Sequence, residues 1–164
     1  MTRLLFVCMG NICRSPTAEA VMRQRLEGVG LAGEVEVDSA GTGAWHVGRP
    51  PDERSAAAAA RRGVTLSGAA RQVRDADFAD FDLLLCADGA NVRELLARLA
   101  PDDPARARVR RLREFDPAAV ARGDLDVPDP YYGGPRGFDD VLDLVTAACD
   151  GLLAAVRDGS LEPA

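Results

Sequence analysis

The stretch that decides the fold is residues 3–16, RLLFVCMGNICRSP, where an apolar run meets a short loop of small and polar residues. After its first arginine the run is apolar through Val7, as expected for a central strand of a parallel sheet that is buried on both faces. Gly10 ends the run, and apolar residues follow at helical spacing from about residue 17 to residue 27. A buried strand that passes through a tight loop into a helix is typical of an α/β domain.

The remaining chain alternates in the same way between strand and helix patterns. We predict strands over 3–7, 34–38, 81–87 and 109–112, helices over 17–27, 52–62, 90–99 and 138–156, and a loop rich in glycine and proline over 39–51. Residues 117–137 are rich in Pro, Gly and Asp and carry no predicted strand or helix. The alternation predicts an α/β fold, a four-stranded parallel sheet flanked by helices. No repeat or linker divides the chain, so we expect one domain over residues 1–157 and a frayed tail over 158–164.

Composition excludes several classes of protein. The chain has 164 residues, 47% of them hydrophobic and 28% charged, which is ordinary for a globular domain. Its 20 basic residues, all arginine, face 26 acidic ones, and the net charge of −6 argues against a nucleic-acid partner. The apolar run near the N-terminus is too short for a signal peptide or a membrane span. We therefore expect a cytoplasmic protein without a membrane partner, and a monomer by default.

The cysteines do not form a pattern of disulfides or metal ligands. Four are spread through the chain, no two are spaced C-x-x-C, and His46 is the single histidine. We therefore expect no metal site and no cofactor. Cys86 and Cys149 are expected to be small core residues, which leaves Cys8 and Cys13 as candidates for chemistry.

Residues 8–14 fit a loop that wraps around one tetrahedral oxyanion. Gly10 and Asn11 tolerate the left-handed conformations that point backbone N–H groups inward, and the following helix turns its N-terminus toward the same place. Arg14 can offer a bidentate fork to two phosphate oxygens. In such surroundings Cys8 is favoured as a thiolate, the form that acts as a nucleophile, and Ser15 can donate its hydroxyl to the sulfur.

A second candidate group lies in residues 127–133, VPDPYYG. Expelling an alkoxide or phenoxide from phosphorus requires a proton donor, and prolines on both sides of Asp129 hold its carboxylate in a defined place. Tyr131 and Tyr132 can line a slot for an aromatic group. Asp124 and Asp126 are rivals for the acid role that the sequence does not separate from Asp129.

Together, residues 7–16 and the distant DPYY sequence resemble the low-molecular-weight protein tyrosine phosphatase family, in its bacterial form, over nearly the whole chain. The resemblance implies metal-independent hydrolysis of phosphotyrosine in protein substrates, with inorganic phosphate as product and competing ligand. It implies that Cys8 is the nucleophile that forms a phosphocysteine, that Arg14 binds the phosphate and that Asp129 is the general acid and base. The remaining implied roles are loop support by Ser39, loop support and substrate binding by Asn11 and Ser15, substrate binding by Met9, Gly10, Ile12, Cys13, Trp45, Tyr131 and Tyr132, and redox protection of Cys8 by Cys13.

The sequence departs from the family pattern at one position. Many members carry a histidine in an H-x-A-R-Q stretch that supports the loop asparagine and serine. The matching residues 68–72 read GAARQ, so Gly68 stands where that histidine is expected. His46 lies in the loop after Ser39, and the sequence does not show whether it substitutes.

Three other functions remain open. A thioredoxin-coupled arsenate reductase of the same fold needs two further cysteines six residues apart, and Cys86 has no such partner. A protein-arginine phosphatase tends to have threonine where this loop has Ile12, and an apolar residue there favours an aromatic ester. A phosphotyrosine-binding module without turnover would be expected to lack Cys8 or Asp129.

Overall fold

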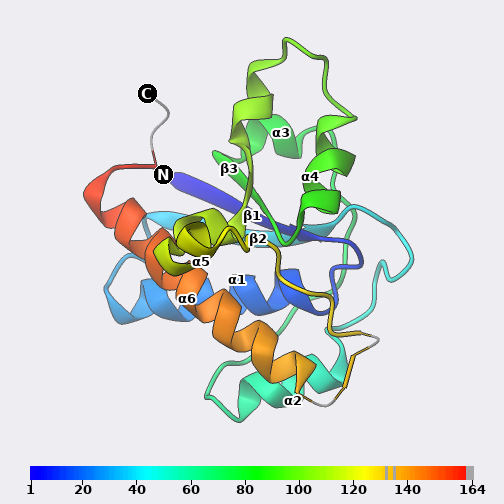
Figure 1. Cartoon of the computed structure of the whole chain (residues 1–164), viewed down its shortest axis with the longest axis vertical. Coiled ribbons are helices and arrows are strands. Elements are labelled where there is room, and N and C mark those ends of the chain that lie inside the picture. The colour runs from blue at the N-terminus through cyan, green and yellow to red at the C-terminus, as the bar shows by residue number, and fades with distance from the viewer. Residues whose placement is uncertain (132, 135, 162–164) are drawn as a thin grey trace.

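The computed structural model describes residues 1–131, 133–134 and 136–161 and contains a single four-stranded parallel sheet (Figure 1). The sheet has the order β2-β1-β3-β4 and comprises β1 (Thr2–Cys8), β2 (Val35–Gly41), β3 (Leu83–Cys86) and β4 (Val109–Arg111). The α-helices are α1 (Arg14–Gly28), α2 (Glu53–Ala60), α3 (Asp77–Asp80), α4 (Gly89–Leu96), α5 (Pro117–Arg122) and α6 (Gly137–Asp158), and two 3₁₀ turns are η1 (Pro104–Arg108) and η2 (Leu112–Phe115). The predicted α/β fold class is confirmed.

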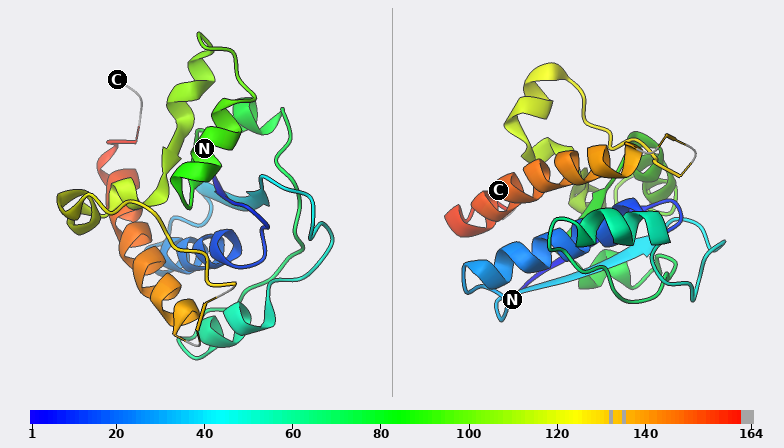
Figure 2. Two further views of the ribbon diagram at one scale, coloured as in Figure 1. Left: turned by 45° about the vertical axis from the view of Figure 1, so that its right-hand side comes forward. Right: turned by 90° about the horizontal axis from the view of Figure 1, so that it is seen from below.

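Side chains of β1 alternate between two hydrophobic cores, one on each face of the sheet. Leu4 and Phe6 pack into the larger core, which contains apolar residues of α1 and α6. Leu5 and Val7 pack into the second core, on the face that α3 and α4 cover. Figure 2 shows α1 and α6 lying together on one side of the sheet. The central strand is therefore buried on both faces, and its last residue, Cys8, is fixed at the C-terminal edge of the sheet.

Two boundaries near the loop differ from prediction. The first helix begins at Arg14 rather than at Thr17, because the loop itself turns directly into it. β2 continues to Gly41, so the first residues of the predicted loop over 39–51 form strand pairs with the end of β1. A Cβ atom at Gly41 would lie 2.8 Å from the Met9 carbonyl oxygen. The glycine therefore allows the end of β2 to lie close to the loop after β1, and it does not mark a turn.

The segment over 117–137 contains a helix that was not predicted. Asp116 accepts a hydrogen bond from the Ala118 N–H, proline opens α5, and Gly123 ends it with a φ of 68°. These are ordinary start and stop signals for a helix. The high content of Pro, Gly and Asp in this segment had suggested a loop instead.

The C-terminal helix also extends further than predicted. α6 reaches Asp158, the Ser160 N–H bonds to the Ala155 carbonyl, and Leu161 packs against the larger core. Of the expected tail, Asp158, Gly159 and Ser160 are exposed, Leu161 packs against the larger core, and 162–164 lie outside the described residues. Within the described chain, every helix is too short or too polar to cross a bilayer.

Candidate active site

The loop of residues 8–14, here called the anion loop, closes around the Cys8 sulfur. The Asn11 N–H donates to Cys8 Sγ over 3.3 Å, and Asn11 is the only described non-glycine residue with a positive φ, 56°. Its left-handed conformation turns the backbone inward, as a nest for an anion requires. The described first turn of α1 has no acidic residue and no side-chain cap, so its N–H groups are available to a bound anion.

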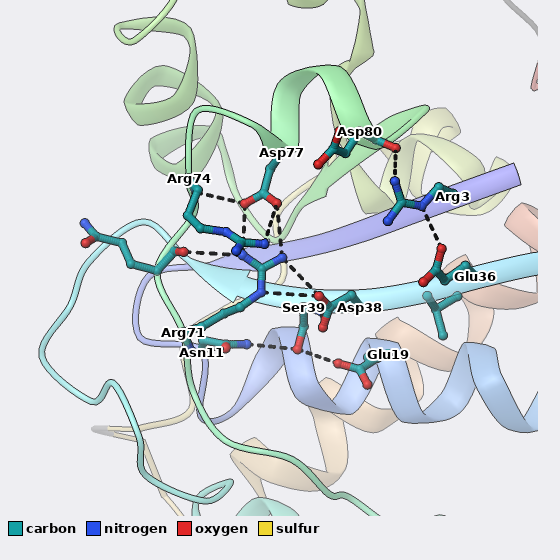
Figure 3. Close-up of polar contacts among 12 residues, drawn as sticks. Arg3, Asn11, Glu19, Glu36, Asp38, Ser39, Arg71, Arg74, Asp77 and Asp80 are labelled. Carbon is teal, nitrogen blue, oxygen red and sulfur yellow. Dashed lines mark hydrogen bonds and ion pairs between the residues drawn. The ribbon is translucent and has the colours of Figure 1, made fainter.

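A directed chain of hydrogen bonds supports the sulfur from behind the loop, and Figure 3 shows its part from Glu19 through Ser39 to Asn11. A Glu19 carboxylate oxygen accepts from the Ser39 hydroxyl over 2.6 Å, so Ser39 Oγ is left to accept from Asn11 Nδ2 over 3.0 Å. The second Nδ2 hydrogen reaches Ser15 Oγ over 2.8 Å. Because Ser15 accepts that bond, its own proton points along the 3.0 Å contact to Cys8 Sγ. The Glu19 carboxylate can only accept hydrogen bonds, so it orients the donors of Ser39 and Asn11 along the chain toward Ser15 and the Cys8 sulfur.

The other end of the Asn11 amide is fixed by Arg71. Asn11 Oδ1 accepts from the Arg71 N–H over 3.0 Å, and the Arg71 guanidinium reaches Asp38 over 3.0 Å and Asp77 over 2.9 Å (Figure 3). The Asp77 side chain is fully buried. Burial alone would raise the pKa of Asp77, but hydrogen bonds from Arg71 and Arg74 outweigh it and hold that pKa below the usual 3.8.

Arg14 is buried at the first turn of α1 and points across the C-terminal edge of the sheet. Its Nη1 donates to Asp88 over 2.7 Å and to the Val127 carbonyl over 2.8 Å. Burial acts to lower the pKa of Arg14, but the charges of Cys8, Asp88 and Asp129 raise it, so the guanidinium stays a cation. The bonds on Nη1 hold it in place and leave Nη2 on the side of Asp129, 3.8 Å from its carboxylate.

One pocket brings the predicted chemical groups together. It is lined by Cys8, Met9, Gly10, Ile12, Cys13, Arg14, His46, Asp129 and Tyr131. Asp124 and Asp126 lie elsewhere, paired with Arg113 and Arg111. Of the three candidate carboxylates, Asp129 alone is therefore placed among the described residues that face the anion loop.

The aromatic wall differs from the sequence expectation. Trp45 is 71% exposed and packs over Gly43, and the described residues that line the pocket include its neighbour His46 instead. The His46 ring lies against Gly10, and its centroid is 6.2 Å from that of Tyr131. Tyr132 lies outside the described residues. His46 therefore takes part in the pocket wall and not in the hydrogen-bond chain behind Asn11.

The position where the family histidine is expected, Gly68, has room for a side chain. Gly68 has a φ of 86°, and a Cβ atom there would meet no described atom within 4 Å. Ser39 donates directly to Glu19, so the series of hydrogen bonds behind Asn11 is complete without an imidazole. The predicted loop support by Ser39 has a geometric counterpart, since Ser39 Oγ lies between Glu19 and Asn11.

The side of the pocket formed by Ile12 and Tyr131 contacts the start of α2. Asp52 N bonds to the Ile12 carbonyl over 2.8 Å, and the Arg54 guanidinium lies 5.2 Å from the Tyr131 ring centroid and 4.7 Å from that of Phe138. The anion loop, α2 and the segment after Asp129 are therefore braced against one another on this side.

The other cysteines are held as thiols. Burial raises the pKa of Cys13 to about 12, although a hydrogen bond with Ser55 acts to lower it. Burial also raises the pKa of Cys86 and of Cys149. Cys86 lies in β3 and Cys149 in α6, both fully buried, as predicted for core residues. Among the described residues, no three His, Cys, Asp or Glu side chains gather as metal ligands would.

Three supporting residues were missed by the sequence analysis: Glu19, Arg71 and Asp88. Asp88 had a usable signal, because it follows β3 and the carboxyl ends of parallel strands meet at one edge of a sheet. Glu19 and Arg71 lie on a helix and in an irregular segment, where polar residues are common. Arg71 also had a signal, because it stands in the 68–72 stretch that resembles the family's loop-supporting sequence, and it bonds to Asn11. The contact of Glu19 with Ser39 joins positions 20 residues apart, which no local pattern reveals.

Comparisons with known proteins agree with this geometry. The family model described as low molecular weight phosphotyrosine protein phosphatase matches residues 3–160. A low molecular weight protein-tyrosine-phosphatase of Streptomyces coelicolor is 55% identical over 156 residues, covering 95% of this chain and 94% of that protein. A protein tyrosine phosphatase from Entamoeba histolytica, solved with Hepes in its active site, superposes with a TM-score of 0.90 at 36% identity, covering 98% and 99% of the two chains. A Drosophila arginine phosphatase superposes with a TM-score of 0.86 at 30% identity, covering 96% and 98%.

Proposed function

Because the chain belongs to the low molecular weight phosphotyrosine protein phosphatase family, we propose that it hydrolyses phosphotyrosine in proteins through a phosphocysteine on Cys8. One observation carries this proposal: Cys8, Arg14 and Asp129 line one pocket, at the N-terminus of a helix. The sulfur receives two hydrogen-bond donors, so the thiolate is stabilised without an added base.

In the first step the Cys8 thiolate attacks phosphorus, a P–S bond forms and the bond to the phenolic oxygen breaks. Arg14 and the N–H groups of the anion loop hold the phosphoryl oxygens and stabilise their charge. Protonated Asp129 gives its proton to the leaving oxygen, so tyrosine departs as a neutral phenol.

In the second step the Asp129 carboxylate takes a proton from water. The resulting hydroxide attacks phosphorus, the P–S bond breaks, and inorganic phosphate is released with Cys8 again a thiolate. Ser15 stabilises the departing sulfur through its 3.0 Å contact. Arginine and backbone N–H groups supply the positive charge in both steps, and the proposed mechanism assigns no role to a metal ion or cofactor.

The pocket wall supports an aromatic ester as substrate. Ile12 is buried in the wall, and Tyr131 and His46 line the same pocket with their ring centroids 6.2 Å apart. An apolar and aromatic slot suits a phenyl ring, whereas a phosphoarginine substrate would bring a polar guanidino group into it. The likeness to the Drosophila arginine phosphatase makes phosphoarginine the alternative substrate that the assay must include.

The deciding experiment measures initial rates on matched phosphotyrosine, phosphoserine and phosphoarginine peptides in excess chelator, with Cys8→Ser as control. The proposal expects turnover selective for phosphotyrosine that Cys8→Ser abolishes while phosphate binding remains. Preference for phosphoarginine would be consistent with the mechanism but would contradict the proposed substrate. Lack of turnover on all three peptides would contradict the proposal and favour a binding module or an arsenate reductase. Action on proteins in the cytoplasm as a monomer, and redox protection of Cys8 by Cys13, remain parts of the proposal.

A further inference from the structure

Arg113 is the largest fully buried side chain of the described molecule, and the proposed mechanism does not use it. It lies in η2, the 3₁₀ turn that follows β4 and packs against α5 and α6. A Cβ atom at Gly151 of α6 would lie 1.8 Å from the Phe115 carbonyl oxygen, so α6 presses directly on this turn. Arg113 is therefore held in a rigid, closely packed place.

In the described part of the chain, the polar contacts of the Arg113 guanidinium are all made by Nη1, and both lead to the same segment. Nη1 donates to the Asp126 carbonyl over 2.7 Å and lies 3.2 Å from the Asp124 carboxylate. Nε and Nη2 are buried and have no partner in the described part of the chain. Burying a cation with unsatisfied donors is unfavourable, and a methionine would fill a similar space without that loss. Stability alone therefore does not account for a guanidinium here.

The segment that Arg113 holds leads directly to Asp129. Between α5 and α6, yellow in Figure 1, the chain passes the loops that follow β1 and β3. The Val127 N–H bonds to the Ala87 carbonyl over 2.7 Å, and the Val127 carbonyl accepts from Arg14. The Asp126 carboxylate accepts from the Gly89 N–H over 3.0 Å. Arg113 supplies the buried anchor behind these contacts, at the carbonyl of Asp126, which lies three residues before Asp129.

From this placement we propose that Arg113 is a positioning residue that sets the Asp129 carboxylate for proton transfer to the leaving group. The inference rests on the proposed general-acid role of Asp129. Val127 connects Arg113 with the pocket. Its N–H binds the carbonyl of Ala87, just after β3, and its own carbonyl binds Arg14. Arg113 holds the preceding carbonyl, that of Asp126. Loss of that anchor lets the segment shift, and a displacement of about 1 Å is enough to weaken catalysis strongly.

The test compares Arg113→Met, which removes the donors and keeps the apolar stem, with Arg113→Lys, which keeps a cationic donor group on one nitrogen. The readout is kcat/KM on a phosphotyrosine peptide and on para-nitrophenyl phosphate, whose leaving group needs little protonation. For Arg113→Met we expect kcat/KM on phosphotyrosine to fall about ten- to a hundredfold, with a much smaller loss on the nitrophenyl ester. Arg113→Lys should recover most of the loss. Arg108→Met removes another arginine that binds backbone carbonyls, far from the pocket, and serves as the matched control.

Equal losses on both substrates, or no loss in a folded Arg113→Met protein, would overturn the inference. Asp129→Asn is run beside it: if that variant shows no dependence on the leaving group, the general-acid role of Asp129 in the proposed function fails. If it shows that dependence and Arg113→Met does not, the role of Arg113 alone fails. Urea unfolding reports whether each variant is folded. If Arg113→Met does not fold, Asp124→Arg decides, because it places a like charge beside Nη1 at an exposed position. The same selective loss on phosphotyrosine is then expected, and its absence would count against the proposal.

Discussion

Ser15→Ala tests the directed hydrogen-bond chain at its last member, the hydroxyl that contacts the Cys8 sulfur. The Ser15 hydroxyl lies 3.0 Å from Cys8 Sγ in a buried position, and its other partner, Asn11, already donates to it. The substitution therefore removes a hydrogen bond to an anion, worth about 1.5–3 kcal/mol. In the second step the sulfur leaves as a thiolate, so the loss falls on breakdown of the phosphocysteine, which should slow by about 10- to 150-fold.

The assay is rapid-mixing hydrolysis of para-nitrophenyl phosphate. Slower breakdown with continued formation predicts a burst of nitrophenol, close to one equivalent per site, followed by the slowed steady state. Thr17→Ala is the matched control: Thr17 is a buried hydroxyl on the same helix, but it donates to the Cys13 carbonyl and not to the sulfur. It should cost about 1 kcal/mol of unfolding free energy and leave the burst unchanged. A slowed Ser15→Ala enzyme without a burst, or an equal kinetic loss in Thr17→Ala, would refute the assignment.

Three more outcomes are expected. Asp129→Asn should lower kcat/KM on phosphotyrosine by about 10²- to 10⁴-fold and affect para-nitrophenyl phosphate far less; equal losses would remove Asp129 as the acid. Glu19→Leu should lower kcat more than Glu19→Gln, since glutamine can still accept from Ser39, and equal kcat values would contradict a directed chain. The depressed pKa of Asp77 means that its ion pair stabilises the fold above about pH 4 and is lost as the pH falls through the folded-state pKa. Asp77→Asn should therefore flatten the acid limb of urea stability against pH, and an unchanged limb would show that the pair contributes little.

The anion loop could be predicted from the sequence because its parts are contiguous. Residues 8–14 carry the nucleophile, the turn residues and the arginine within one strand–loop–helix unit, and strand burial fixes where that unit must lie. Asp129 could be proposed because its flanking prolines are visible and because the resemblance assigns it the acid role; its place in the pocket wall favours it over Asp124 and Asp126 on independent grounds. Those two carboxylates are occupied by Arg113 and Arg111.

What the sequence could not give are contacts between distant segments. Arg14 meets Asp88 across 74 positions, and Arg71 meets Asn11 across 60. In the loop after β2, adjacent residues face different ways, so pattern alone could not assign the pocket wall to His46 rather than Trp45. Composition also misled at α5, where proline and glycine mark the ends of a helix rather than a loop.

The central claim is that Cys8 carries the phosphoryl group during turnover. The most direct measurement is to mix Asp129→Asn with para-nitrophenyl phosphate, quench in acid, and map the added phosphoryl mass by peptide mass spectrometry. Because water activation is impaired in this variant while a good leaving group still departs, the account predicts a phosphoryl group on the peptide that contains Cys8, and its absence from Cys8→Ser. Turnover with no phosphoryl group on Cys8, or with one on another residue, would contradict it.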